Sequence, residues 1–257
     1  MYKMVVSDFF GALINKEEAI SLSTMLELDK MRKEGVLFCI TTDHSARIVN
    51  DYNRDFPFID YIVDFNGSYV YDVNKKKTLY NKRLSAVEFK KIYKLFSKKD
   101  MCFYTLDNCN YTGKYRDDDY SEMVIDIDDF IEEKKTAIYK VKIFFEDKKE
   151  ANEAYKLLKD NPKLSCYLGE ENKVFVIEIY NSINSKLLGV EKILTKKKLS
   201  LQDVLVVCVA SSSCSLAKQA GCSYVMANGD KDLRKIIKNV TGSNEEKGVE
   251  QVLKKYY

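Results

Sequence analysis

The first residue in this chain that is suited to chemistry is Asp8, which follows the apolar run Met4–Val6 and precedes a turn containing Gly11. An apolar run ending in an aspartate predicts a buried parallel strand that carries a carboxylate at its carboxyl end. In open α/β sheets this edge is where ligands bind. Asp8 is therefore a candidate site residue, and the alternative interpretation is an aspartate that only caps the turn after its strand.

The remaining candidates are one histidine and a serine run. His44 is the single histidine of the 257 residues, and its ordinary pKa suits acid–base work near neutral pH, although a lone histidine is more often a surface or cleft residue. The run Ser211–Ser215 predicts either an anion-binding turn, because N–H groups at a helix start attract phosphate, or a plain polar turn. No base accompanies these serines, so we exclude a serine nucleophile.

Cysteine usage argues against a zinc site. The 7 cysteines include no C-x-x-C motif, and only one histidine is present. Several cysteines lie in apolar strands, as Cys39 and Cys208 do, which predicts buried free thiols in a reducing compartment. No signal peptide precedes the first strand, and no apolar run approaches the roughly 18 residues of a membrane span. We therefore expect a cytoplasmic protein.

The elements that position Asp8 follow the order of a right-handed βαβ unit. We expect a helix of about five turns between a capping-box-like start at Asn15 and a stop at Gly35, and then a buried strand over Val36–Thr41. The next expected elements are a short helix from Ser45 to Tyr52, a strand over Tyr61–Asp64, a turn at Asn66–Gly67, and a hairpin of Tyr69–Val73 with Thr78–Leu84.

From about Leu84 the pattern changes to that of an inserted α+β unit. Apolar residues alternate with Lys140 and Lys142 over Tyr139–Phe145, which predicts an antiparallel strand with one solvated face. The other expected elements of the insert are helices over Ala86–Ser97 and Asp147–Lys159 and strands near Leu164–Leu168 and Lys173–Tyr180.

The first pattern resumes at Asn184 with a helix to about Lys197. An apolar strand over Val204–Val209, a strand at Tyr224–Met226, and helices from Asp230 and Asn244 follow. We therefore predict an α/β fold. It consists of a Rossmann-like, three-layer core with a parallel sheet over residues 1–83 and 182–257, and an inserted α+β cap domain over residues 84–181.

Composition excludes several classes of partner. Hydrophobic residues make up 46% and charged residues 32% of the chain, as in ordinary globular proteins. The 42 basic and 39 acidic side chains leave a net charge of +3 and are interleaved, so we expect neither nucleic acid nor membrane binding.

Six segments match motifs of one enzyme superfamily in the family's own order. They are D-x-D-G-T-L at Asp8–Leu13, A-T-G-R at Thr41–His44, N-G at Asn66–Gly67, a motif lysine at Lys186, the G-D-G-E-N-D to G-N-A stretch within Asp203–Gly229, and T-N-x-E-D-G-V at Ser243–Val249. Through these segments the chain resembles the haloacid dehalogenase superfamily of phosphatases, in its Cof-type branch with an α/β cap.

The resemblance implies a magnesium-dependent phosphatase of sugar or nucleotide phosphates. The family's first aspartate, here Asp8, attacks phosphorus, and a second aspartate two residues later acts as general acid and base. The resemblance places Thr42 and Lys186 on the phosphoryl oxygens. It also implies substrate-side positions at Asn66, Gly67 and Asn228, and a magnesium ion held by Asp8, the backbone carbonyl of Phe10 and two further acids.

The chain departs from the pattern at the acids themselves. The general acid position holds Phe10, and the metal-binding acids are replaced by Val209 and Ser213. Losing a general acid costs about 10²–10⁴ in rate, and one carboxylate with a carbonyl and hydroxyl groups makes a poor site for a hard cation. The resemblance therefore implies a weak or absent magnesium site.

Three hypotheses follow. We expect a catalytically impaired or non-catalytic protein, a pseudophosphatase, that binds a phosphorylated small molecule or a protein partner. The alternative is an active phosphatase on small phosphate esters, with Asp8 as nucleophile, Lys186 as phosphate clamp and His44 as substitute acid. In a third, purely structural reading, Phe10 and Val209 fill the cleft. The sequence names neither the substrate nor the oligomeric state.

Overall fold

The computed structural model describes residues 1–257 apart from residues 18, 44–57, 107, 117–120 and 134–136. The described residues divide into two compact units. One unit holds Met1–Asp43, 58–81 and Ser185–Tyr257, and the other lies within Lys82–Asn184. Each unit has its own sheet and its own hydrophobic core.

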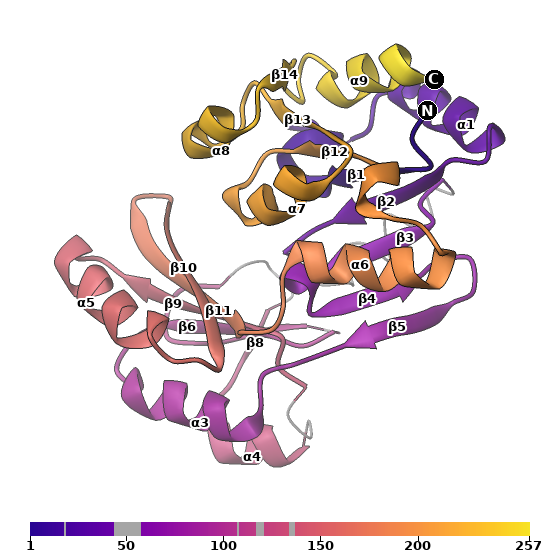
Figure 1. Ribbon diagram of the computed structural model, residues 1–257. Coiled ribbons are helices and arrows are strands. Elements are labelled where there is room, and N and C mark those ends of the chain that lie inside the picture. Colours follow the sequence, from indigo (N-terminus) through magenta and orange to yellow (C-terminus); the bar gives the residue numbers. More distant parts are fainter. Residues whose placement is uncertain (18, 44–57, 107, 117–120, 134–136) are drawn as a thin grey trace. The chain divides into compact units, whose positions relative to one another are not determined.

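The first unit, the core unit, is built on an eight-stranded sheet. Its strands are β1 (Met4–Asp8), β2 (Leu37–Thr41), β3 (Tyr61–Asp64), β4 (Tyr69–Asp72), β5 (Lys77–Asn81), β12 (Val204–Cys208), β13 (Cys222–Met226) and β14 (Asn239–Thr241). They lie in the order β14-β13-β12-β1-β2-β3-β4-β5 (Figure 1). Pairing is parallel from β14 to β3 and antiparallel for β4 and β5, which confirms the predicted parallel sheet and hairpin.

Helices cover both faces of this sheet. They are α1 (Leu22–Lys33), α6 (Lys186–Lys197), α7 (Cys214–Gln219), α8 (Lys231–Ile236) and α9 (Gly248–Tyr256). Val190 and Ile193 of α6 and Leu216 of α7 pack on the sheet face that carries Met4 and Val6. Helices α1 and α9 contact each other on the other face (Figure 1). This is the three-layer α/β arrangement that the sequence predicts.

Helix α1 begins later than predicted. Ser21 supplies its N-cap, because the Ser21 Oγ accepts a hydrogen bond from the Thr24 N–H at 3.2 Å. Asn15 instead closes a local turn, in which its Oδ1 accepts from the Ala19 N–H at 2.9 Å. The capping residue next to the apolar positions therefore determines where the helix starts.

The end of the chain differs in a similar way. Helix α9 begins after Lys247, which has a left-handed backbone (φ 59°), and not near Asn244. The strand β14 was not predicted, because three residues are too few to show a period. The helix predicted from Ser45 to Tyr52 lies outside the described residues.

The second unit, the cap unit, has a six-stranded sheet in the order β10-β11-β9-β6-β7-β8. Its strands are β6 (Met101–Tyr104), β7 (Cys109–Thr112), β8 (Glu122–Met123), β9 (Lys140–Phe145), β10 (Leu164–Glu171) and β11 (Val174–Asn181), and its helices are α3 (Ala86–Leu95), α4 (Ile127–Glu133) and α5 (Lys148–Lys159). Apolar side chains from all three helices and from β6, β9, β10 and β11 form its core.

The prediction that one face of this sheet is solvated is wrong for β9, in which every residue is buried. The Lys140 ammonium pairs with Glu178 at 2.5 Å and lies over the rings of Tyr104 and Tyr180. Lysine tolerates this environment because its stem packs on apolar surface while its charge keeps a partner.

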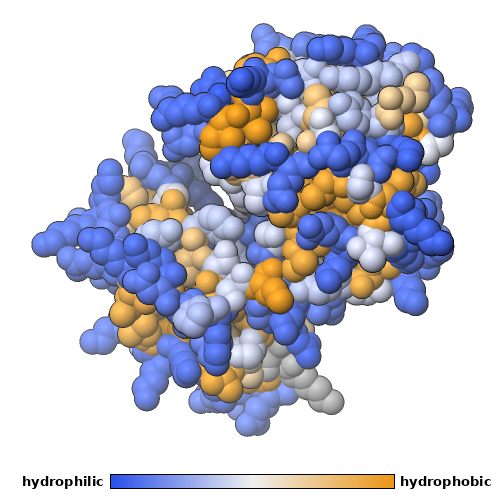
Figure 2. Space-filling model, viewed as in Figure 1, coloured by the Kyte–Doolittle hydropathy of each residue, from blue (hydrophilic) through white to orange (hydrophobic). Residues whose placement is uncertain are grey.

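Hydrophilic side chains cover most of the face shown in Figure 2, with apolar patches between them. Among the helices that the structure describes, none combines the length and the apolar character needed to cross a membrane. All seven cysteines are free thiols.

Candidate active site

Asp8 lies at the carboxyl end of β1, and only 4% of its surface is exposed. Strand β1 pairs in parallel with β12 on one side and β2 on the other. The segments that follow these three strands therefore meet at one edge of the sheet, where the sequence places the site.

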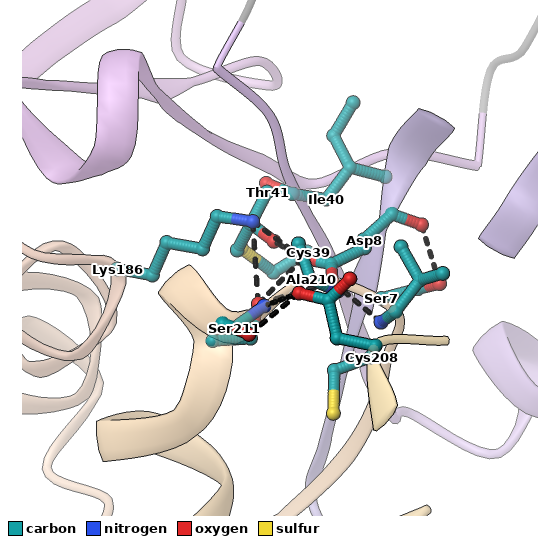
Figure 3. A network of polar contacts seen from close by, with 12 residues as sticks. Ser7, Asp8, Cys39, Ile40, Thr41, Lys186, Cys208, Ala210 and Ser211 are labelled. Atoms are coloured by element: carbon teal, nitrogen blue, oxygen red, sulfur yellow. Dashed lines mark hydrogen bonds and ion pairs between the residues drawn. The ribbon is translucent and has the colours of Figure 1, made fainter. Parts of the chain in front are cut away.

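Side chains of the protein itself engage one oxygen of the Asp8 carboxylate (Figure 3). Oδ1 accepts from Lys186 Nζ at 2.7 Å, Thr41 Oγ1 at 2.6 Å and Ser213 Oγ at 2.8 Å. Each of these three donor residues is at most 2% exposed. Oδ1 thus lies inside a shell of buried donors.

Backbone donors engage the other oxygen. Asp8 Oδ2 accepts from the N–H groups of Val209 at 2.8 Å and Ala210 at 3.3 Å, and it lies 3.0 Å from Ser213 Oγ. An ionised carboxylate offers about four lone-pair sites. The five donor groups around Asp8 are therefore enough to saturate it.

The turn after β12 binds two anions, and both belong to the chain. Its Val209 and Ala210 N–H groups donate to Asp8, while the Ser211 N–H and Oγ both donate to Asp230 Oδ2 at 2.6 Å. These contacts hold the turn in place with carboxylates of the chain itself, and phosphate binding by the serine run stays a prediction. Asp230 was not predicted as a partner, because the contact depends on how β12 and β13 end.

Helix α6 brings Lys186 to Asp8 from far along the chain. Ser185 caps the helix, since its Oγ accepts from the Leu188 N–H at 3.1 Å, and Lys186 is the first helical residue. A cation at a helix start opposes the helix dipole. The buried ion pair with Asp8 at 2.7 Å offsets this unfavourable interaction and explains why the lysine stands there.

The Asn66–Gly67 turn supports this helix. Gly67 has φ +87°, and a Cβ at this position would lie 1.9 Å from the Ser185 carbonyl oxygen. No other residue type fits so close to the start of α6. Gly67 therefore has a structural role in placing Lys186, and a contact with substrate stays a prediction.

Thr41 contacts Asp8, which was not predicted; the predicted role of its neighbour Thr42, on the phosphoryl oxygens of a substrate, stays a prediction. In the parallel pairing of β1 with β2, Asp8 and Thr41 are register partners, so their side chains lie on the same face. The pairing register would have identified Thr41, but a motif match cannot supply it. Thr42 comes next and its N–H donates to the Val63 carbonyl at 2.9 Å.

Asn66 lies close to Thr42. Its N–H donates to the Thr42 carbonyl at 3.4 Å, and both residues are 1% exposed. The structure thus gathers the ends of β2 and β3 near the site, while a phosphate contact for either side chain stays a prediction. His44 lies outside the described residues.

The turn after Asp8 is closed by Asn228 and Val209. Asn228 Nδ2 donates to the Gly11 carbonyl at 2.8 Å, and a Cβ on Gly11 would be 3.4 Å from the Val209 side chain. The Phe10 ring packs edge to face on Phe9, with 5.1 Å between ring centroids. Val209 therefore covers the turn, and the expected contact between Phe10 and Val209 stays a prediction.

The donor set does not fit a magnesium ion. The two predicted carboxylate positions hold Val209 and Ser213, and no cluster of three or more His, Cys, Asp or Glu ligands occurs among the described residues. Magnesium requires oxygen ligands with free lone pairs in near-octahedral geometry. Those of Asp8 already accept hydrogen bonds, and the Phe10 carbonyl would be a single further ligand.

Lys186 takes the role of counter-ion to Asp8. Burial opposes ionisation of Asp8, but the Lys186 ammonium and the surrounding hydrogen-bond donors outweigh it and lower the pKa of Asp8 below its ordinary value of 3.8. Burial likewise disfavours the charged lysine, while Asp8 and Asp43 raise the pKa of Lys186 above its ordinary 10.5. The pair is therefore ionised at neutral pH.

Comparison with known proteins agrees with the motif order. The family model of the haloacid dehalogenase-like hydrolases matches residues 5–253. YitU of Bacillus subtilis, a 5-amino-6-(5-phospho-D-ribitylamino)uracil phosphatase, is 21% identical over 99% of this chain and 97% of its own length. The putative phosphatase YxeH of the same organism is 24% identical over 97% of this chain and 96% of its own.

Solved structures show the same fold. A haloacid dehalogenase-like hydrolase from B. subtilis superposes with a TM-score of 0.87 at 15% identity, over 99% of this chain and 100% of that one. A sugar phosphatase of subclass IIB superposes with a TM-score of 0.80 at 18% identity, over 99% and 98%. Because the family model covers residues 5–253, the chain belongs to the haloacid dehalogenase-like hydrolases.

Proposed function

We propose that this protein is a pseudophosphatase: it binds a phosphorylated small molecule at the carboxyl edge of the core sheet and hydrolyses it weakly or not at all. The observation that carries the proposal is the Asp8 carboxylate, both of whose oxygens accept hydrogen bonds from the chain itself. A nucleophile in this state must give up its donors before it attacks phosphorus.

The chain lacks the general acid that would protonate the leaving group. Phe10 stands where the family has its general acid, and a phenyl ring neither gives nor takes a proton. Without an acid the leaving group departs as an alkoxide, and the rate falls by about 10²–10⁴.

Charge makes the same step harder. A phosphate dianion approaching Asp8 meets a like charge, and in the family a magnesium ion screens that repulsion. Here Lys186 is paired with Asp8 at 2.7 Å, so this pair presents no net positive charge to the phosphate. This arrangement supports weak binding and slow transfer.

Support for a phosphorylated ligand comes from the relatives and from the remaining donors. YitU is named for a sugar phosphate ester, and a structural neighbour is a sugar phosphatase. Lys186 has three N–H donors, of which two are used by Asp8 and Ser213. The ligand class we propose is a sugar or nucleotide phosphate, with a protein partner as the second class.

The location we propose is the cytoplasm, as part of the same hypothesis. It is supported by the free state of all seven cysteines, because thiols persist in reducing compartments. The balanced charge of 42 basic and 39 acidic side chains gives no support to nucleic acid or membrane partners.

The test compares turnover and binding on one panel of sugar phosphates and nucleoside monophosphates, with magnesium or manganese present. The expected result is binding by calorimetry without measurable phosphate release. Metal-dependent turnover that Asp8→Asn abolishes, in a variant shown to be folded by circular dichroism, would overturn the proposal. If no compound of the panel binds, the proposal that the protein binds a phosphorylated small molecule is contradicted.

Restoring the acids provides a positive control. The triple variant Phe10→Asp, Val209→Asp, Ser213→Asp rebuilds the family pattern and should gain magnesium-dependent phosphate release. Ser215→Asp adds a carboxylate at an exposed position of the same segment and should gain none.

The alternative is an active phosphatase with Asp8 as nucleophile. It is favoured by the lowered pKa of Asp8, which keeps the carboxylate ionised. If this alternative holds, the unmodified chain releases phosphate from compounds of the same panel, as the triple variant does.

A further inference from the structure

Strand β10 forms an outer edge of the cap sheet and lacks the features that protect the other sheet edges (Figure 1). At the opposite edge of the same sheet, β8 is 2 residues long, and in the core sheet the edge strand β14 has 3. The remaining edge, β5, has 5 residues, begins with Lys77, and shifts register against β4. Short length, lysine and bulges are the usual protections of an edge.

Strand β10 lacks short length, lysine and bulges, and its only charged residues are Glu170 and Glu171 at its end. It is 8 residues long, contains neither lysine nor proline, and pairs with β11 without a register shift. Within the part of the chain that the structure describes, no strand pairs with its outer side. Apart from the Leu164 N–H, which donates to the Asn161 carbonyl at 3.0 Å, its outward N–H and C=O groups form a row that can hydrogen-bond to another strand.

The side chains of β10 are already placed for a continuing sheet. Leu164, Cys166 and Leu168 pack on the core of the cap unit, and Tyr167 on the other face lies edge to face with Tyr180, at 6.0 Å between centroids. A strand added in the plane of the sheet would leave both faces as they are.

We propose that β10 pairs with β10 of a second copy of this chain, antiparallel, about a two-fold axis at Tyr167. A two-fold axis perpendicular to the sheet joins residues that face the same side. Centring the axis on Tyr167 uses the whole strand. It places Ser165 opposite Gly169, where the glycine has open space beside it.

Charge complementarity indicates that the strand pairing with the open edge of β10 is β10 of a second copy. In this register Lys163, just before β10, lies opposite Glu171 at its end, and the symmetry repeats the pair at the other end. A second copy carries the complementary cation and anion at the spacing that this register requires. The two side chains are 68% and 46% exposed and are paired within the chain to Glu88 at 3.4 Å and Lys142 at 3.1 Å. Their partners Glu88 and Lys142 are only 6% and 5% exposed, so each side chain keeps its partner within the chain and uses its exposed side for the pair across the axis.

The first test is sedimentation of the full chain over a range of concentrations. The expected species has the mass of two chains at high concentration. Lys163→Glu and Glu171→Lys should each weaken association about tenfold, and the double variant should restore it. Glu170→Lys makes the same charge change opposite Leu164 and should have a smaller effect.

The second test is a symmetric cross-link. Tyr167→Cys places two thiols directly opposite each other across the axis, within the Cα distance that a disulfide spans, and mild oxidation should give a disulfide-linked dimer. Ser165→Cys, opposite Gly169, should give no more than the parent chain. A monomer at all concentrations overturns the proposal. So does a dimer that neither the charge exchange nor the cross-link affects, because it must use another surface.

Discussion

At the scale of residues, the Asp8 carboxylate and the Lys186 ammonium form an ion pair at 2.7 Å whose side chains are 4% and 2% exposed. Each charge lost the solvation of water on folding, and each now depends on the other. Thr41 and Ser213 add hydrogen bonds to the same oxygen. The residue that matches the family's nucleophile is thus the centre of a buried hydrogen-bond network.

Removing one partner leaves a buried charge without compensation. We expect Asp8→Asn and Lys186→Met each to lower the free energy of unfolding by about 3–5 kcal/mol, and the double variant to lose much less than the sum. Urea unfolding of the four chains measures this cycle. Lys33→Met, which breaks the exposed pair with Asp29, should change stability little. Additive losses would contradict a coupled pair.

The same pair predicts how stability depends on pH. The pKa of Asp8 is lowered from 3.8, so its contribution is present above that value and is lost as pH falls through the folded pKa. The pKa of Lys186 is raised from 10.5, so its contribution is present below that value and is lost as pH rises beyond it. The stability difference between the unmodified chain and Asp8→Asn should be flat between about pH 5 and 9 and shrink in acid. A difference that grows in acid would contradict this linkage.

At the scale of elements, the site depends on a close approach between the turn after β3 and the start of α6. Gly67 makes the approach, with φ +87° and the Ser185 carbonyl against its Cα. Lys186 follows Ser185 directly, so a displacement of this contact moves the ammonium away from Asp8.

Gly67→Ala should therefore destabilise the protein far more than a left-handed backbone alone accounts for. Gly35 provides the matched control, because it has a similar φ of +81° but nothing within 4 Å of a Cβ. Gly35→Ala should cost about 1–2 kcal/mol, the strain of a non-glycine residue in this region. Gly67→Ala adds a steric clash with backbone, and thermal unfolding compares the two. Equal losses would show that the close approach does not matter.

At the scale of the whole molecule, the chain has two separate hydrophobic cores. Ile177 belongs to the core of the cap unit and Ile193 to that of the core unit, and both are 0% exposed. Contacts concentrate within each unit, which is the usual condition for separate cooperative unfolding.

Truncating either isoleucine should destabilise mainly the unit that contains it. Ile177→Ala and Ile193→Ala should each cost about 2–5 kcal/mol. Hydrogen exchange should accelerate within Lys82–Asn184 for the first variant and within the core unit for the second. Equal acceleration across the whole chain in both variants would show that the units unfold as one.

The sequence by itself determined the fold and the outline of the site. Local patterns suffice for the apolar strand before Asp8, the hairpin after Asn66–Gly67 and the resumption of the core pattern after the cap. The motif match also identified Asp8 and Lys186 as members of one site, and the structure pairs them at 2.7 Å. These features depend on residues close together in the chain or on one charge that needs another.

Only the tertiary structure decided what surrounds Asp8 and which lysines are buried. Thr41 contacts Asp8 because the register between β1 and β2 sets which side chain faces it. The N–H groups of Val209 and Ala210 reach the carboxylate because β12 lies beside β1. Lys140 is buried although its strand alternates like a solvated one, because Tyr104, Tyr180 and Glu178 come to it from other strands. Such partners are distant in sequence, and strand pairing, which brings them together, leaves no local pattern.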